Sequence, residues 1–328
     1  MTPVTTVRAV ATSARRADLP GADGADDEER RRRAYRRRRT LMTTLTGWGF
    51  VGPAVLVILG LSVFPAIWAF FLSRQKWNGF SRAKDVGWSN YSRLAEDPDL
   101  AAAVVHTLVF TALFVPSSIL LGILLAVALN QRIRFVAFYR TCIFVPFVAS
   151  AAATGILGNF VFSPQFGLVN NLLRLLHVPQ QGFLEDPHQA MVVIAVMSLW
   201  QQLGFTVVVY LAALQDIPRD LVEAAVTDGA NSRQVFRHVT LPQLAPVTVF
   251  TTIWQTITAI QLFDLVFTTT KGGPLKSTET VVYYLYNQAF HALNFGYGSA
   301  VAYGLFAVTM LITLAMVVYS RITKFEAF

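Results

Sequence analysis

Residues 104–130 read VVHTLVFTALFVPSSILLGILLAVALN and contain no aspartate, glutamate, lysine or arginine. An apolar run of about 20 residues is long enough to cross a bilayer as an α-helix. In hydrocarbon every backbone N–H and C=O group must find its partner inside the protein, so a helix is the form that such a run takes. This stretch therefore predicts a membrane-spanning helix.

Five further runs of the same kind flank it on both sides. The alternating ten-residue segments of a transmembrane β-barrel are absent. Only 14% of the 328 residues are charged and 54% are apolar, whereas a soluble domain carries about 25% charged residues. The sequence predicts an all-α polytopic membrane protein with six transmembrane helices at about 45–73, 104–130, 136–162, 190–214, 247–268 and 298–320.

The basic residues are distributed unequally between the two sides of the membrane. Six spans place both termini on one side, and of the 27 lysines and arginines 19 fall on that side and 8 on the other. Loops rich in lysine and arginine stay in the cytoplasm, so both termini are predicted to be cytoplasmic. Residues 1–44 carry 11 of these charges and almost no apolar residue. They are expected to form a disordered basic tail that lies against anionic lipid headgroups, with no nucleic-acid partner.

The longest cytoplasmic loop, residues 215–246, contains two short helical patterns. Residues 215–242 read QDIPRDLVEAAVTDGANSRQVFRHVTLP. Pro218 and Asp220 favour the start of a helix, and Gly229 permits the turn that ends it. A second helix is expected to begin at Ser232 and to stop at Pro242. Two short amphipathic helices between membrane spans are typical of a docking surface for a cytoplasmic partner.

The spacing within this loop resembles that of one protein family. Glu223-Ala224-Ala225, three residues, Gly229, nine residues, Val239, one residue and Leu241-Pro242 match the EAA loop of bacterial ABC importer permeases, with valine at the position usually held by isoleucine. The resemblance covers residues 45–325, which would form one transmembrane permease domain. It implies that the loop couples to an ATPase subunit through Glu223, Ala224, Ala225, Asp228, Gly229, Leu241 and Pro242.

Later motifs resemble the carbohydrate-uptake branch of that family, which includes maltose-type and sn-glycerol-3-phosphate-type permeases. They are Phe263-Asp264, Thr270-Lys271-Gly272-Gly273-Pro274 and Tyr286-Asn-Gln-Ala-Phe290. The resemblance implies a subunit of the bacterial inner membrane that forms half of a translocation pathway. It also implies three kinds of partner: a second permease, two cytoplasmic ATPase subunits and an external substrate-binding protein. The binding protein would contact Lys271, Gly272, Gly273 and Pro274.

The chain is not expected to be an enzyme. It contains no G-x-x-x-x-G-K-[ST] phosphate-binding loop, so ATP and Mg²⁺ would bind to the partner ATPase subunits. Its five histidines are scattered and Cys142 is its single cysteine, which leaves no pattern for a metal site or a catalytic group. No cofactor is predicted for this chain.

Two sets of residues at membrane depth are candidates for the substrate pathway. Helical spacing places each set on one helix face, and amides and hydroxyls beside aromatic rings suit a polyhydroxylated solute. The first set is Ser198, Gln201, Gln202 and Phe205, and the second is Gln255, Thr258, Leu262 and Asp264. The glutamines could instead bridge helices, and Asp264 could be solvated or paired with Lys271.

Three other functions compete with the importer. A secondary transporter would carry ionisable residues near the bilayer midplane, and none is visible in the runs. A membrane enzyme would need clustered catalytic groups. A permease for amino acids or oligopeptides is opposed by the Gly-Gly-Pro stretch and the glutamine-rich faces.

Overall fold

The computed structural model describes residues 35, 42–44, 46–131 and 133–322. Contacts between residues divide the chain into two units, residues 1–67 and residues 68–328. The predicted basic tail, residues 1–44, lies almost wholly outside the described part. The helical stretch Met42–Ser73 begins in the first unit and contains the π-helical turn Leu59–Val63 and helix α2 (Phe64–Ser73).

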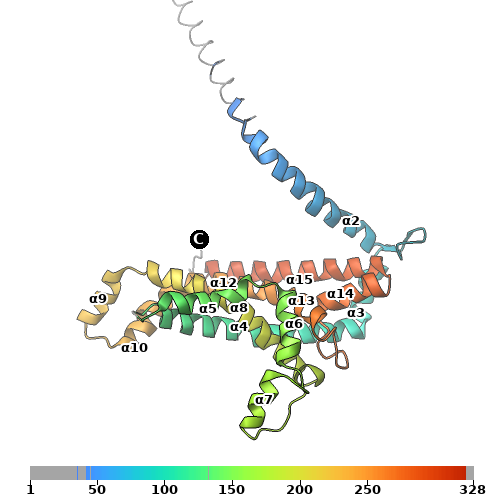
Figure 1. Ribbon diagram of the computed structural model, residues 1–328. Helices are drawn as coiled ribbons and strands as arrows, with labels where there is room; N and C mark the ends of the chain where they lie inside the picture. Colours follow the sequence, from blue (N-terminus) through green and yellow to red (C-terminus); the bar gives the residue numbers. More distant parts are fainter. Residues whose placement is uncertain (1–34, 36–41, 45, 132, 323–328) are drawn as a thin grey trace, which may run out of the picture. The chain divides into compact units, whose positions relative to one another are not determined.

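The described part of the chain is mostly helical (Figure 1). Its longer helices are α3 (Ser89–Glu96), α4 (Pro98–Leu129), α5 (Val136–Val148), α6 (Ala151–Val161), α7 (Leu168–Leu175), α8 (Ala190–Asp216), α9 (Arg219–Thr227), α12 (Ala245–Ile260) and α15 (Phe295–Ile322). Its short helices are α10 (Ser232–Val235), α11 (Leu241–Gln243), α13 (Asp264–Thr268) and α14 (Val281–Tyr286), with π-helical turns at Phe236–Thr240 and Asn287–His291 and a 3-10 turn at Phe183–Glu185. Strands β1 (Gln75–Lys76) and β2 (Lys84–Asp85) pair antiparallel.

Within the described residues, five helical stretches are long and apolar enough to cross a membrane. They are Met42–Ser73, Pro98–Leu129, Ala190–Asp216, Ala245–Thr268 and Phe295–Ile322. A sixth crossing is present if α5 and α6, which meet at an angle of 103°, form one span. The predicted all-α polytopic fold is confirmed, but the single helix expected at 136–162 is wrong.

Local chemistry explains the break between α5 and α6. Pro146 lacks a backbone N–H and so weakens the last turn of α5. Ala149 is extended, with φ −68° and ψ 144°. Ser150 then caps α6, because its Oγ accepts a hydrogen bond from the N–H of Ala153 at 3.2 Å. Gln201 of α8 donates its amide to the Ala149 carbonyl at 3.1 Å, which satisfies an acceptor that the break exposes.

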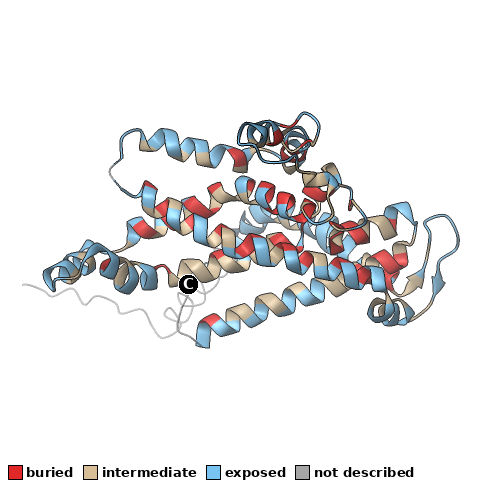
Figure 2. Ribbon diagram, turned by 90° about the horizontal axis from the view of Figure 1, so that it is seen from below, coloured by how far each residue is buried: buried red, intermediate tan, exposed pale blue. Residues whose placement is uncertain are grey.

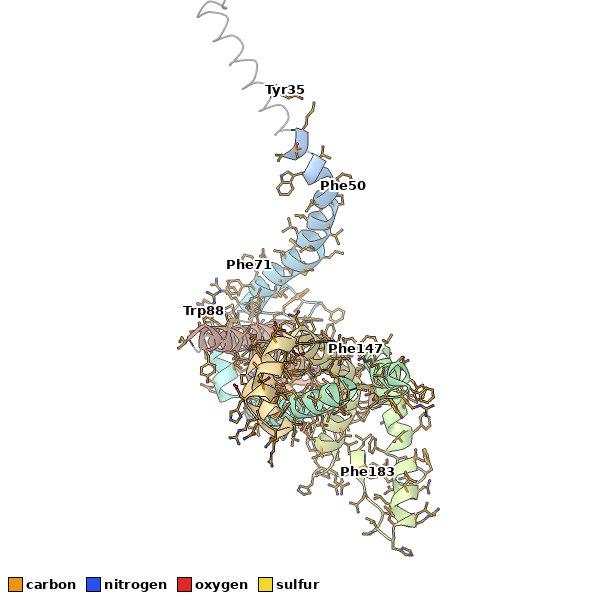
Figure 3. All side chains as sticks on the ribbon, turned by 90° about the vertical axis from the view of Figure 1, so that its left-hand side faces the viewer. Tyr35, Phe50, Phe71, Trp88, Phe147 and Phe183 are labelled. Carbon is orange, nitrogen blue, oxygen red and sulfur yellow. The ribbon has the colours of Figure 1, made fainter. Side chains whose placement is uncertain are left out.

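Helices α4, α8 and α12 pack together at the centre of the second unit, with α5 against α8 and α15 against α12. Buried positions follow the inner faces of these helices (Figure 2). Gly204 allows α8 to approach α5 closely, since an added Cβ there would lie 2.6 Å from the Ile143 carbonyl oxygen. Phe147 of α5, which is labelled in Figure 3, stacks on Phe205 of α8 with ring centroids 5.6 Å apart.

The two ends of this bundle are occupied by different elements. Figure 1 shows α9 and α10 at one end, and α3 with α14 at the other. Helix α4 runs between the two ends as one helix of 32 residues, a length of about 48 Å at 1.5 Å per residue. The loop that contains α9 and α10 and the segments that contain α3 and α14, which the sequence predicts to lie on opposite sides of the membrane, are therefore at opposite ends of the bundle.

Candidate functional sites

Helix α9 presents the first part of the candidate coupling loop. It begins at Arg219 after Pro218, and Asp220 lies in its first turn, as the sequence predicts. The side chains of Glu223 and Ala224 are exposed, and Ala225 is half-buried. At the end of α9 the N–H of Asp228 donates to the Ala224 carbonyl at 2.9 Å. The exposed surface of the helix therefore includes a carboxylate next to a small side chain.

The turn after α9 depends on a glycine. Gly229 has φ +86°, and an added Cβ would meet nothing within 4 Å. Only the backbone conformation, which favours glycine, restricts this position. The following helix starts at Ser232, as predicted. Its cap is Asn231, whose side chain accepts from the N–H of Gln234 while the Gln234 side chain accepts from the N–H of Asn231.

The expected stop at Pro242 is wrong. The helical path widens into the π-turn Phe236–Thr240, and Pro242 lies in the first turn of α11, where a missing N–H leaves no helical bond unmade. Leu241 and Pro242 are both exposed. The second half of the loop is therefore helical from Ser232 to Gln243, one residue past Pro242, and a turn at Leu244 separates it from α12.

A polar cavity of about 540 Å³ lies between this loop and the bundle. Glu223 and Arg219 contribute charged side chains, and Asn130 contributes the residue just beyond α4. Leu221 and Val226 of α9 are 43% and 58% exposed. Exposed apolar side chains next to a charged hollow are typical of a surface that binds another protein.

The residues proposed for the interior pathway differ in their surroundings. Gln255 is fully buried, and its Nε2 donates to Thr206 at 2.7 Å and to Ser118 at 3.2 Å. The two hydroxyls lie 3.1 Å apart. This triad joins α4, α8 and α12, which is the helix-bridging arrangement considered as the alternative.

The predicted residues on α8 also differ from one another in burial and in hydrogen bonding. Ser198 and Gln201 are buried, and the Gln201 amide bonds to the break between α5 and α6. The Ser198 hydroxyl has no hydrogen-bond partner among the described residues. Gln202 and Phe205 are half-buried. The face that helical spacing predicts is present, but its residues do not share one environment.

An aromatic row continues from this face toward α12. Phe205 lies between Phe147 and Trp254, and its ring centroid is 5.3 Å from that of Trp254. Thr258 donates its hydroxyl to the Trp254 carbonyl at 3.0 Å. Leu262 is buried, and Asp264 is exposed at the start of α13. The second predicted set is thus spread along α12 and past its end.

The Gly-Gly-Pro stretch forms a closed loop at the opposite end from α9. The hydroxyls of Thr270 and Thr278 lie 2.7 Å apart, and Thr278 also donates to the Gly273 carbonyl at 2.7 Å. Gly272 adopts φ +82°, where an added Cβ would come within 2.9 Å of the Tyr283 ring. Leu275 stands at the tip with 89% exposure. Lys271 is exposed, Gly272 is buried, and Gly273 and Pro274 are half-buried.

A cluster around Asp97 was not predicted. Asp97 caps α4 by accepting from the N–H groups of Asp99 and Leu100 at 3.1 and 3.2 Å. Its other oxygen accepts from the hydroxyls of Tyr284 and Tyr297, each at 2.6 Å. The Asp-Pro pair ahead of an apolar run signals the helix cap, but no sequence pattern signals the two tyrosines.

The charges in this cluster are consistent with the geometry. Burial acts to raise the pKa of the Asp97 carboxyl, but the hydrogen bonds from the two tyrosines and two backbone N–H groups outweigh it and hold that pKa below its ordinary value. Burial, together with the hydrogen bond to Asp97, raises the pKa of Tyr284. The hydrogen bond to Asp99 raises the pKa of Lys276. The cluster therefore consists of a carboxylate and neutral phenols at neutral pH.

The comparison with known families follows from this architecture. Residues 118–325 match a family described as the binding-protein-dependent transport system inner membrane component. The chain belongs to this family. The permease is 38% identical over 265 residues to the lactose transport system permease protein LacF of Rhizobium radiobacter, which covers 79% of this chain and 88% of that relative. It is 32% identical over 269 residues to the sn-glycerol-3-phosphate transport system permease protein UgpA of Agrobacterium fabrum, covering 80% and 90%.

A solved structure supports the fold of the permease. A chain of a bacterial ABC transporter involved in the import of the acidic polysaccharide alginate matches with a TM-score of 0.77 and 21% identity, over 87% of this chain and 98% of that one. A chain of a bacterial alginate ABC transporter in complex with an alginate pentasaccharide-bound periplasmic protein matches with a TM-score of 0.78 and 21% identity. The permease is therefore a multi-pass membrane protein, and the resemblance drawn from its sequence is confirmed.

Proposed function

We propose that this permease forms half of the translocation path of an ATP-driven importer for a carbohydrate or a polyol phosphate. Relatives that transport lactose and sn-glycerol-3-phosphate support this solute class. A second permease subunit, two cytoplasmic ATPase subunits and an external binding protein complete the assembly in this proposal. ATP and Mg²⁺ bind to the ATPase subunits.

The loop at residues 215–246 carries the proposal. Glu223 stands exposed on a short preformed helix, beside a polar cavity and exposed apolar side chains. An ATPase subunit with a basic residue in a surface cleft can accept this helix, while Ala224 and Ala225 allow close approach. Packed interfaces move as rigid bodies, so closure of two ATPase subunits on ATP can be transmitted through α9 to the bundle.

The substrate path in this proposal runs beside α8 and α12. Gln202, Phe205 and Thr258 are the predicted residues of α8 and α12 whose side chains remain partly accessible. An amide, an aromatic face and a hydroxyl offer the donors, acceptors and stacking surface that a polyhydroxylated solute needs. Ser198, Gln201, Gln255, Leu262 and Asp264 stand behind them or beyond the end of α12, and we assign them supporting places along the same path.

The test is ATP hydrolysis by the purified membrane complex, obtained by co-expression with the genes that flank this one. The variant Glu223→Ala is compared with Glu185→Ala, which removes an exposed glutamate from the loop between α7 and α8. We expect binding protein plus one sugar or glycerol phosphodiester to stimulate hydrolysis, and only Glu223→Ala to abolish the stimulation. If no ATPase copurifies and hydrolysis never appears, the proposal fails and a secondary transporter becomes the better account.

The turn at Gly229 offers a second test of the same loop. Gly229→Val introduces a β-branched residue at φ +86°, and we expect it to cost about 1 kcal/mol or more and to misdirect α9. Gly229→Asn is the matched control, because asparagine tolerates the left-handed region. Stimulated hydrolysis should fall sharply in the valine variant and only slightly in the asparagine variant. Equal activity in the two variants would show that the angle of this turn is unimportant for coupling.

A further inference from the structure

The external segment 269–294, which connects α13 to α15, is tied at several points to one end of α4. Lys276 forms an ion pair with Asp99 at 2.9 Å. The ring nitrogen Nδ1 of His106 lies 3.2 Å from the Glu279 carbonyl oxygen. All the α4 residues in these contacts belong to its first three turns.

The tie at Asp97 is the best shielded of these contacts. Tyr284 and Tyr297 are each only 3% exposed, and both hydroxyls converge on one oxygen of the carboxylate. The Arg93 guanidinium lies 3.9 Å from the centroid of the Tyr297 ring and 3.9 Å from the same carboxylate oxygen. Gln288 donates to the Tyr284 hydroxyl at 3.0 Å. We call Asp97, Tyr284 and Tyr297 the clasp.

The clasp joins elements that the chain does not join locally. Asp97 lies between α3 and α4, whereas Tyr284 belongs to α14 and Tyr297 to the first turn of α15. The segment between the two tyrosines thus returns to the same carboxylate at both of its ends. Hydrogen bonds to a charged group are stronger than those between neutral groups, so this carboxylate fixes the segment more firmly than neutral contacts could.

The segment it fixes carries the most exposed large apolar side chain among the described residues. Leu275 is 89% exposed at the tip of the loop that Thr270 and Thr278 close. Between this loop and the clasp, Val281 donates its N–H to the Thr107 hydroxyl at 3.0 Å. The tip is therefore closed by its own hydrogen bonds and held on α4 by the residues that follow it, rather than suspended on a free linker.

We propose that Asp97 is a positioning residue, which acts through Tyr284 and Tyr297 to hold segment 269–294 in the conformation that the external binding protein recognises. This inference rests on the proposed function, because it takes the binding protein as the partner. A segment that is ordered before docking loses less conformational entropy on binding. Removal of the clasp weakens docking and leaves the step that follows docking intact.

The experiment uses the double variant Tyr284→Phe with Tyr297→Phe in the whole complex. It deletes both hydroxyl donors and leaves the α4 cap unchanged. We expect the concentration of solute-loaded binding protein that gives half-maximal ATPase stimulation to rise about tenfold, the equivalent of one hydrogen bond to a charged group. Maximal stimulated rate and basal hydrolysis should stay within about twofold. Tyr139→Phe, at an exposed tyrosine of α5, is the control.

Asp97→Asn gives the conservative comparison. Asparagine caps a helix as well as aspartate does, so α4 still begins at its normal position while the charged acceptor is lost. We expect a rise in the half-saturating concentration smaller than that of the double variant. A merely structural defect would lower the maximal rate with the amount of folded complex and would not change the half-saturating concentration.

A second readout does not depend on hydrolysis. A spin label is attached at Leu275→Cys in a Cys142→Ser background, which leaves one thiol in the chain. The double tyrosine variant should increase the mobile component of its spectrum. If half-saturation and label mobility both match the wild type, the clasp does not position the segment and the inference is overturned. If even the wild type is never stimulated, the proposed function has failed, and label mobility alone decides whether the clasp holds the loop.

Discussion

Gln255 lies where α4, α8 and α12 meet, and its amide forms hydrogen bonds with polar side chains of the other two helices. Its Nε2 donates twice, while its Oε1 has no hydrogen-bond partner among the described residues. In Gln255→Leu the Ser118 and Thr206 hydroxyls, 3.1 Å apart, can still bond to each other. We therefore expect a loss of about 1 kcal/mol, measured as a lower midpoint of thermal unfolding in detergent.

The control for this substitution is Gln261→Leu, at an exposed position just after α12. It should leave the unfolding midpoint unchanged. Solute selectivity should be the same in both variants, because a fully buried side chain has no surface for the solute. A change of selectivity in Gln255→Leu at unchanged stability would place Gln255 in the path instead of between helices.

For single residues, the sequence predicts which face of a helix is polar, but it does not predict which residues of other helices that face contacts. Gln255 and Ser118 are 137 positions apart, and Asp97 and Tyr297 are 200 positions apart. Such pairs form only when helices pack, and no local spacing encodes that packing. Gly229 and Asn231 act within their own turn. The sequence therefore predicts the turn at Gly229 and the helix start at Ser232, which Asn231 caps.

At the scale of elements, the contact between α5 and α8 depends on Gly204. An added Cβ would lie 2.6 Å from the Ile143 carbonyl oxygen and 2.9 Å from the Cα of Phe144. Both are backbone atoms that cannot rotate away, so Gly204→Ala should force the helices apart and cost about 1–3 kcal/mol. Gly304→Ala is the control, because its Cβ would meet only Leu94 Cδ1 at 3.4 Å. Equal unfolding midpoints for the two variants in detergent would contradict this packing argument.

The membrane-spanning helices show which features of the fold a hydropathy pattern can predict. Five of the predicted spans correspond to helical stretches that are long and apolar enough to cross a membrane, although the one at Ala245–Thr268 is interrupted between Ile260 and Asp264. The third does not, since Pro146 and Ser150 divide residues that hydropathy joins. A proline inside an apolar run signals a weak point, but no local pattern predicts the 103° bend or the hydrogen bond that the Gln201 amide donates at the break. Pro242 does not stop the second helical segment, because it lies in the first turn of α11, where a missing N–H leaves no helical bond unmade.

At the scale of the whole molecule, α4 spans from one functional surface to the other. Its first turns hold the clasp and the external loop, its middle contributes Ser118 to the triad, and Asn130 just beyond it lines the cavity beside Glu223. In the proposed function, a helix of about 48 Å would give the side that meets the binding protein and the side that meets the ATPase a common rigid element. Events at the two ends can then bias one packing arrangement of the bundle, which is the physical requirement for coupling.

The coupling loop and the loop that carries Leu275 should therefore face opposite sides of the membrane. Cytoplasmic loops carry the excess of lysine and arginine, and the side that holds both termini has 19 of the 27. With Cys142→Ser as background, Ser232→Cys and Leu275→Cys place single thiols at two exposed positions. A membrane-impermeant maleimide should label Leu275→Cys in spheroplasts and Ser232→Cys only in inside-out vesicles. The reverse pattern would invert the orientation, and labelling of both thiols from one side would show that the chain crosses the membrane an even number of times between residues 232 and 275, which a single span at Ala245–Thr268 does not allow.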